Sequence, residues 1–253
     1  MEKKFLKTFL AAAALLPLAL SATLAACESG KEESTYDGPT YSVACLGDSI
    51  TRGFGLPSEK YSYPSLMEAD EMISSVQNVG YSASTVGLRS DDEASLNQHA
   101  FVNRYTQIEA ETDIIFVLGG TNDYRSDYGS VPLGEYGDTD SSTFYGAMEV
   151  LIAGLTESYP GAVLLFGTPL PRYDADMTEE NGSGGTLEDY RNAVLEACGA
   201  HGIGTLDLFT AAELVPEADG HEDWYSDDGV HPNTDGAALI AEYVLGKIRD
   251  TLS

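Results

Sequence analysis

Basic side chains are scarce in this sequence of 253 residues, which has 13 Lys and Arg against 41 Asp and Glu. The formal net charge of −28 at pH 7 would repel a polyanion such as DNA, and nucleic-acid binding is therefore excluded. Cysteine is rare as well. The three cysteines are too few for a disulfide scaffold and lack the paired short spacing of a zinc site. The hydrophobic fraction of 43% is nevertheless that of a folded soluble domain.

The longest apolar run spans residues 8–20 and follows a basic segment, residues 1–7. This is the pattern of a secretory signal. A membrane-spanning anchor usually needs about 20 apolar residues and a basic stop after them. Here Pro17 interrupts the run and Glu28 follows it, so we expect a cleaved signal and not a spanning helix.

The segment ends in Leu24-Ala25-Ala26-Cys27, which resembles the lipobox of bacterial lipoproteins. The resemblance implies that residues 1–26 are a lipoprotein signal peptide and that Cys27 becomes the lipid-carrying first residue. The mature protein would then be anchored to the cell membrane on its extracellular side, or in the periplasm of a host with two membranes. Ordinary secretion with a free Cys27 thiol is the alternative. Residues 27–39 are predicted to be a flexible tether, and residues 40–253 the folded domain.

From residue 41 onward, short apolar runs alternate with longer amphipathic ones. The predicted strands are Tyr41–Leu46, Ser75–Val79, Asp113–Leu118, Ala162–Gly167 and Ile203–Leu206. The predicted helices are Tyr63–Met72, Asp91–Gln107, Ser142–Tyr159, Thr186–Ala200 and Asn233–Leu252. This alternation predicts an α/β three-layer sandwich with a five-stranded parallel, flavodoxin-like sheet. Ligand sites in such sheets lie beyond the carboxyl ends of the strands.

Ser49 follows the first predicted strand within Gly47-Asp48-Ser49. A serine at a strand-to-helix turn holds its hydroxyl at the edge of the sheet, and its own N–H is unpaired at the helix N-terminus. Ser49 is therefore a possible nucleophile, and a simple N-capping serine is the alternative. The segment is not the G-x-S-x-G elbow, because Thr51 replaces the second glycine.

Asn122 follows the third predicted strand within Gly119-Gly120-Thr121-Asn122-Asp123. Its amide can donate to a neighbouring oxyanion. A turn that caps the next helix is the alternative interpretation.

Asp228 and His231 lie three residues apart before the last predicted helix. In a turn, the carboxylate can accept from the ring Nδ1–H, which fixes the tautomer and leaves Nε2 free to take a proton from a serine. A surface histidine without a partner is the alternative. Asp227 is a second candidate partner, although its spacing fits less well.

Four blocks occur together and in order: Gly-Asp-Ser at 47–49, an Asn-containing block at 78–85, Gly-Thr-Asn-Asp at 120–123 and Asp-Gly-Val-His at 228–231. This combination resembles the SGNH hydrolases, also called the GDSL esterase/lipase family, over roughly residues 41–252. The resemblance implies the SGNH fold and the hydrolysis of carboxylic esters. It also implies that Ser49 is the nucleophile and a backbone oxyanion donor, that His231 is the general base, that Asp228 orients His231, and that Asn122 is the side-chain oxyanion donor.

One position departs from the family pattern. The family's glycine donor falls five residues after Asn78, where this sequence has Ala83. Alanine supplies the same backbone N–H, and a difficulty arises only if the backbone there needs a positive φ, which alanine disfavours. We therefore retain Ala83 as the third oxyanion donor. The implied mechanism requires no metal or organic cofactor.

The loop Tyr124–Ser142 is long and polar, and long loops in compact domains are usually functional. Its tyrosines, with Tyr173, Trp224 and Tyr225 in other loops, offer flat faces and hydroxyls suited to a sugar. No loop carries the continuous apolar surface that a long-chain lipid needs. We therefore expect an esterase that removes short acyl groups, such as acetyl, from an extracellular carbohydrate. A lysophospholipase or thioesterase is the enzymatic alternative, and a non-catalytic surface binding lipoprotein is the other.

The remaining candidates are weaker. Cys45 and Cys198 are predicted to be buried free thiols, with a disulfide between them left open. The acidic segments 138–140 and 221–223 can attract Ca²⁺, but solvated acidic loops are commoner, and no metal site is expected. The sequence indicates no oligomeric state.

Overall fold

The computed structural model describes residues 36–90, 94–126, 128–174, 176–211, 224–226 and 228–253. The chain divides into two units, residues 1–35 and 36–253, and only the second is described below. The predicted signal segment, Cys27 and most of the predicted tether therefore lie outside the described residues. Among the helices that are described, none has the length and apolar character needed to cross a membrane.

Five parallel strands form one sheet in the order β2-β1-β3-β4-β5, which confirms the predicted flavodoxin-like arrangement. The strands are β1 (Tyr41–Gly47), β2 (Ile73–Gly80), β3 (Ile114–Leu118), β4 (Val163–Gly167) and β5 (Gly204–Leu206). In the register of the sheet, Gly47 lies beside Gly80 on one side and Leu118 on the other. The strands that precede three of the four sequence blocks therefore end at the same edge.

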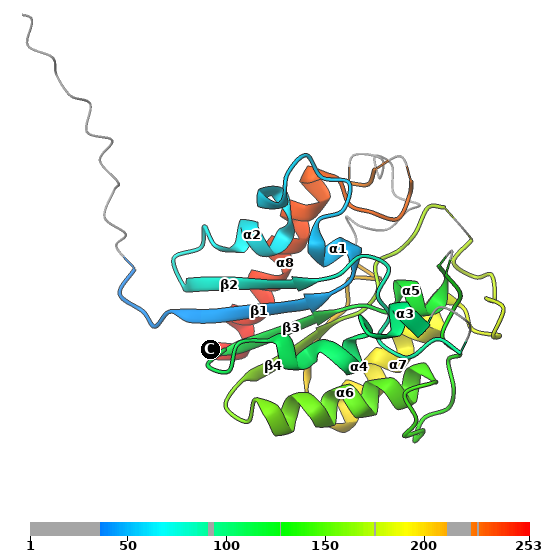
Figure 1. Ribbon diagram of the computed structural model, residues 1–253. Coiled ribbons are helices and arrows are strands. Elements are labelled where there is room, and N and C mark those ends of the chain that lie inside the picture. The colour runs from blue at the N-terminus through cyan, green and yellow to red at the C-terminus, as the bar shows by residue number, and fades with distance from the viewer. Residues whose placement is uncertain (1–35, 91–93, 127, 175, 212–223, 227) are drawn as a thin grey trace, which may run out of the picture. The chain divides into compact units, whose positions relative to one another are not determined.

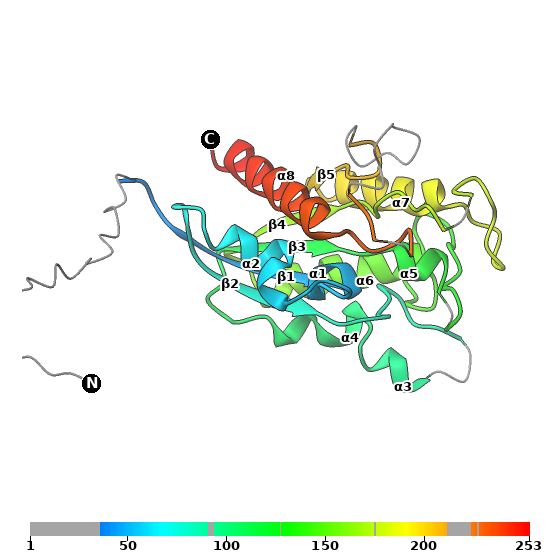
Figure 2. The same cartoon turned by 90° about the horizontal axis from the view of Figure 1, so that it is seen from above.

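Helices cover both faces of the sheet (Figures 1 and 2). On one face lie α2 (Tyr63–Met67) and α8 (Thr234–Leu252), and on the other lie α4 (Phe101–Arg104), α6 (Phe144–Ser158) and α7 (Leu187–Ala200). The shorter elements are α1 (Ser49–Arg52), η1 (Glu59–Tyr61), α3 (Ala94–Asn97), η2 (Tyr105–Gln107) and α5 (Thr121–Tyr124).

The three longest helices begin at side-chain caps that the sequence encodes. Thr143 accepts from the Gly146 N–H before α6, and Asn233 accepts from two N–H groups at the start of α8. At α7, Thr186 and Asp189 form a reciprocal capping box. Such caps satisfy N–H groups that have no partner inside the helix, each contributing about 1 kcal/mol.

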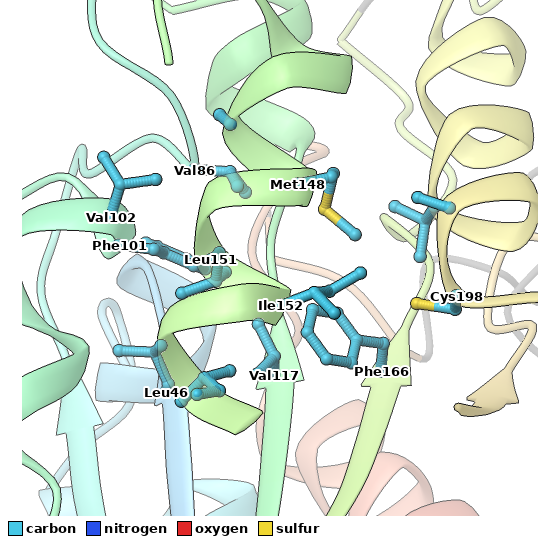
Figure 3. Packing of buried hydrophobic residues seen from close by; sticks show 14 of the residues in the cluster. Leu46, Val86, Phe101, Val102, Val117, Met148, Leu151, Ile152, Phe166 and Cys198 are labelled. Carbon is cyan, nitrogen blue, oxygen red and sulfur yellow. The ribbon is translucent and has the colours of Figure 1, made fainter. Parts of the chain in front are cut away.

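Two hydrophobic cores lie on the two faces of the sheet. In the first, Leu46, Val117 and Phe166 of the strands pack against Leu151 and Ile152 of α6 (Figure 3). The second core packs the other strand side chains against α2 and α8. All five residues of β3 are buried, as expected for a central strand covered on both faces.

The predicted helix over residues 91–107 is wrong as a single element. Residues 91–93 lie outside the described part, and the rest forms α3, α4 and η2. Ala100 interrupts the helix with an extended backbone (φ −59°, ψ 147°). As a result, the Phe101 N–H donates to the Thr85 carbonyl at 2.9 Å, and the chain is tied to the loop after β2 instead of to its own preceding turn.

Candidate active site

Ser49 is the first residue of α1, directly after β1. Asp48 caps this short helix, because its carboxylate accepts from the Ile50 N–H at 2.9 Å. The turn is tight at Gly47, where an added Cβ would lie 1.8 Å from Thr51 Oγ1. The strand end and the cap together fix the direction of the Ser49 side chain.

A continuous chain of hydrogen bonds joins Ser49, His231 and Asp228. Ser49 Oγ lies 2.8 Å from His231 Nε2, and His231 Nδ1 lies 2.7 Å from Asp228 Oδ2. Asp228 is thus the partner on Nδ1, whereas the alternative Asp227 lies outside the described residues. This geometry allows the imidazole to accept the serine proton while the carboxylate holds the ring in one tautomer.

The Asp228 carboxylate is held by its own loop. Its Oδ1 accepts from the N–H groups of Val230 and His231 at 2.9 Å each, and from Ser226 Oγ at 2.8 Å. Partial burial raises the pKa of Asp228, but these hydrogen bonds outweigh it and lower the pKa to about 2. Asp228 therefore stays ionised at any ordinary pH and can accept from the ring Nδ1–H of His231.

Two backbone N–H groups face no acceptor at this site. Among the described residues, neither the Ser49 N–H nor the Ala83 N–H donates to another group of the chain. Both residues line the same cavity. They are therefore available as oxyanion donors.

The Asn122 amide lies beside them. Its Nδ2 donates to the Ser84 carbonyl at 2.9 Å and lies 3.5 Å from Asp48 Oδ2, which is too long for a strong hydrogen bond. One amide hydrogen thus fixes the side chain, and the second is available for an oxyanion.

Ala83 has a left-handed backbone, with φ at +62°, and it is the one non-glycine residue with positive φ among those described. The backbone at this position therefore needs a positive φ, which strains alanine. The loop is held in place by buried Arg89, whose Nη2 donates to the Ala83 carbonyl at 2.9 Å.

A buried arginine that we did not single out in the sequence joins the strand ends to this loop. Arg104 donates to the carbonyls of Gly47 and Val79 and to Ser84 Oγ at 3.1 Å. Burial lowers the pKa of Arg104 to about 10, against the opposing effect of the Asp48 charge. No local signal marks Arg104, because a single arginine in a short helix is usually exposed.

Two buried carboxyl groups lie close to the loop. Burial raises the pKa of Asp48 to about 6. Burial also raises the pKa of Asp123 to about 7. The carboxylate of Asp123 accepts from the N–H groups of Val86 and Gly87 at 2.9 and 3.0 Å, and these hydrogen bonds lower its pKa by less than burial raises it. Asp123 thereby fixes the segment that follows the Ala83 turn.

Ser49, His231 and Asp228 line a cavity of about 470 Å³. Most of the residues that line it are polar or charged, and they include the Arg172–Asp174 ion pair at 2.6 Å. The lining residues are Ser49, Phe54, Ser82, Ala83, Asn122, Arg125, Ser126, Tyr128, Arg172, Asp174, Asp228, Val230 and His231.

The aromatic residues at the cavity differ from those expected. Tyr128 is among the lining residues, whereas Tyr173, Trp224 and Tyr225 are not. Tyr225 is 5% exposed and packs against Tyr173, with ring centroids 5.0 Å apart. Phe54, which the sequence analysis did not consider, lines the cavity instead.

The described residues contain no cluster of three or more His, Cys, Asp or Glu that could hold a metal ion. Asp138 and Asp140 accept hydrogen bonds from their own loop and from Thr143, and residues 221–223 lie outside the described part. Cys45 and Cys198 are buried and free.

Comparisons with known proteins identify the family and the fold. Residues 45–239 match the model of the GDSL-like Lipase/Acylhydrolase family. An acetylxylan esterase from Xylanibacter ruminicola is 27% identical over 228 residues, which covers 82% of this chain and 43% of that protein. The chain therefore spans less than half the length of this relative.

Solved structures share the fold. A protein from Lactobacillus plantarum is 32% identical with a TM-score of 0.71, covering 84% of this chain and 98% of its own. A lipase/acylhydrolase from Enterococcus faecalis is 20% identical with a TM-score of 0.59, covering 84% and 97%. The five-stranded parallel sheet is that of the SGNH hydrolase fold.

Proposed function

The chain belongs to the GDSL-like lipase/acylhydrolase family of carboxylic ester hydrolases, and from that premise we propose that it removes short acyl groups, chiefly acetyl, from an extracellular carbohydrate. The observation that carries the proposal is the lining of the cavity that contains Ser49. Charged and hydroxyl side chains surround this cavity, and such groups suit a polar alcohol and a short acyl group better than a long hydrocarbon chain.

In the proposed mechanism, His231 Nε2 accepts the Ser49 proton as Oγ attacks the ester carbonyl, with the 2.8 Å contact already formed. The N–H groups of Ser49 and Ala83 and the amide of Asn122 donate to the oxyanion. Asp228 stabilises the imidazolium ion, which then protonates the leaving alcohol. Water repeats the cycle on the acyl-enzyme.

The relative from X. ruminicola supports the substrate class, because its name identifies an esterase that acts on acetylated xylan. A non-catalytic binding protein is disfavoured, because such a protein would not need the hydrogen-bonded Ser49, His231 and Asp228 at 2.8 and 2.7 Å.

The test is a series of 4-nitrophenyl esters from acetyl to palmitoyl, with Ser49→Ala as the matched inactive control. We expect kcat/KM to be highest for acetyl and to fall with each longer chain. A rate that rises with chain length would support a lysophospholipase or thioesterase and refute the proposal. Turnover that survives Ser49→Ala would remove Ser49 from the mechanism.

We also propose that Cys27 carries a lipid that anchors the protein to the cell membrane. The proposal is supported by the Leu24-Ala25-Ala26-Cys27 sequence after an apolar run. Each buried methylene of the acyl chains would contribute roughly 0.8 kcal/mol to membrane anchoring. Cys27→Ala should shift the protein from the membrane fraction to the medium. A variant that stays with the membrane would refute the lipid anchor.

A further inference from the structure

The Phe54 ring lies between the catalytic candidate His231 and solvent. It is 54% exposed, and its centroid lies 4.8 Å from that of the imidazole at an interplanar angle of 48°. The ring also lines the cavity that contains Ser49. The ring is therefore accessible to a ligand that binds in this cavity beside the imidazole, and its flat face can supply apolar contact area.

The backbone fixes the ring in this position. The Phe54 N–H donates to the Ser49 carbonyl at 2.9 Å, so the residue is tied to the nucleophile itself. Gly53 and Gly55 on either side have φ of +83° and +81°, and a Cβ on Gly53 would lie 2.8 Å from Ser62 Cβ. The sharp turn after α1 therefore requires glycine at position 53.

His231 determines which half of an ester meets this ring. The imidazole must take a proton from Ser49 Oγ and give it to the leaving oxygen, so the alcohol leaves on the imidazole side. The donors at Ala83 and Asn122 bind the carbonyl oxygen instead. Phe54 contacts the imidazole and therefore lies on the alcohol side.

Asp174 also lines the cavity, beside the loop that carries His231. The neighbouring Tyr173 N–H donates to the Gly229 carbonyl at 2.7 Å, which joins this segment to the loop of His231. The carboxylate of Asp174 is fixed by Arg172 at 2.8 and 2.6 Å and is 31% exposed. Its remaining lone pairs can accept from hydroxyl groups.

We propose that Phe54 and Asp174 form the subsite for the alcohol half of the ester. One face of a sugar ring lies against Phe54, and Asp174 accepts hydrogen bonds from the sugar hydroxyls. The inference rests on the proposed function, because it identifies which side chains recognise the carbohydrate.

The test compares two acetate esters that differ only in the alcohol: a methyl xylopyranoside carrying one acetyl group, and ethyl acetate. Phe54→Leu keeps an apolar contact with His231 but removes the flat ring, and Tyr61→Ala removes an exposed aromatic ring that does not line the cavity. We expect Phe54→Leu to lower the ratio of kcat/KM for the sugar ester over ethyl acetate by about tenfold, mainly through KM, equivalent to ~1.4 kcal/mol. Asp174→Asn should lower this ratio as well, and Tyr61→Ala should not change it.

Each other outcome has a distinct meaning. An equal loss of kcat/KM on both esters in Phe54→Leu would show that the ring only supports His231. Unchanged kcat/KM on both esters would show that the ring does not contact the alcohol. Either result overturns the subsite and leaves the proposed function standing. A wild-type protein that hydrolyses ethyl acetate but not the sugar ester would instead refute the carbohydrate function, and the subsite with it.

Discussion

Replacing Ala83 with glycine should stabilise the protein even though the change deletes a methyl group. Ala83 has φ of +62°, a conformation that costs an L-residue with a Cβ roughly 1–2 kcal/mol. Glycine removes this cost but gives the unfolded chain more conformational freedom, which offsets roughly 0.4–1 kcal/mol. The net gain is on the order of 0.5–1 kcal/mol, or about 1–4 °C in Tm for a domain of this size.

The chain offers a matched control at Gly202. This residue has φ of +67°, and an added Cβ would meet nothing within 4 Å. Gly202→Ala therefore measures the cost of a left-handed alanine with no steric contact, and it should lower Tm by about as much as Ala83→Gly raises it. Thermal unfolding followed by circular dichroism at one pH gives both values.

The reasoning is refuted if Gly202→Ala lowers Tm while Ala83→Gly leaves it unchanged or lower. That result would mean that contacts of the Ala83 methyl group outweigh the backbone strain. Hydrolysis of 4-nitrophenyl acetate should survive in Ala83→Gly, because glycine presents the same backbone N–H to the oxyanion.

Three further changes test the site. Asn122→Ala should lower kcat by about 10²–10³, the usual effect of losing one oxyanion donor, and an effect below about threefold would exclude Asn122 from that role. Asp228→Asn should lower kcat by on the order of 10⁴ with little change in KM, because it favours the wrong imidazole tautomer; steady-state kinetics with an acetyl ester decides this. Asp48→Asn tests the pKa of about 6. A carboxyl group whose pKa is raised by folding contributes stability that is present below its unfolded pKa and is lost as pH rises through its folded pKa. Wild type should therefore lose about 2 kcal/mol of unfolding free energy relative to Asp48→Asn between pH 4 and 7. Urea unfolding at several pH values measures the difference, and parallel curves would contradict the raised pKa.

The sheet was predictable because its signals are local. Each predicted strand is present with ends shifted by at most two residues, since short Val, Ile and Leu runs between turn residues permit few alternatives. The positions of Ser49 and Asn122 follow from the same rule, because blocks after parallel strands converge at one edge. Asp228 and His231 precede α8 and do not directly follow a strand. The proximity of His231 to Ser49, 182 residues away, was expected from the resemblance of the four blocks to the SGNH hydrolases.

The aromatic residues show that the strand pattern does not predict the direction of loop side chains. Tyr173, Trp224 and Tyr225 occur in loops at the correct edge, but a residue's loop does not determine whether its ring faces the cavity or the core. Tyr225 packs into the protein, whereas Phe54 faces the cavity because two left-handed glycines turn the chain beside it. Side-chain direction in loops depends on backbone torsions that the sequence pattern does not specify.

The sequence pattern does not mark Arg104 either, and its contacts explain how the ends of β1 and β2 are joined to the Ala83 loop. Burial raises the pKa of Asp48 and lowers that of Arg104, so folding disfavours the charged form of both groups. Buried charges of this kind add little net stability compared with apolar residues. What Arg104 does supply is hydrogen bonds to the ends of β1 and β2 and to Ser84, which no apolar side chain can replace. Since Ser84 follows Ala83 directly, these bonds set the distance between the strained donor and the end of β1, the strand that precedes Ser49. The buried charge of Arg104 is better explained by this placement than by stability.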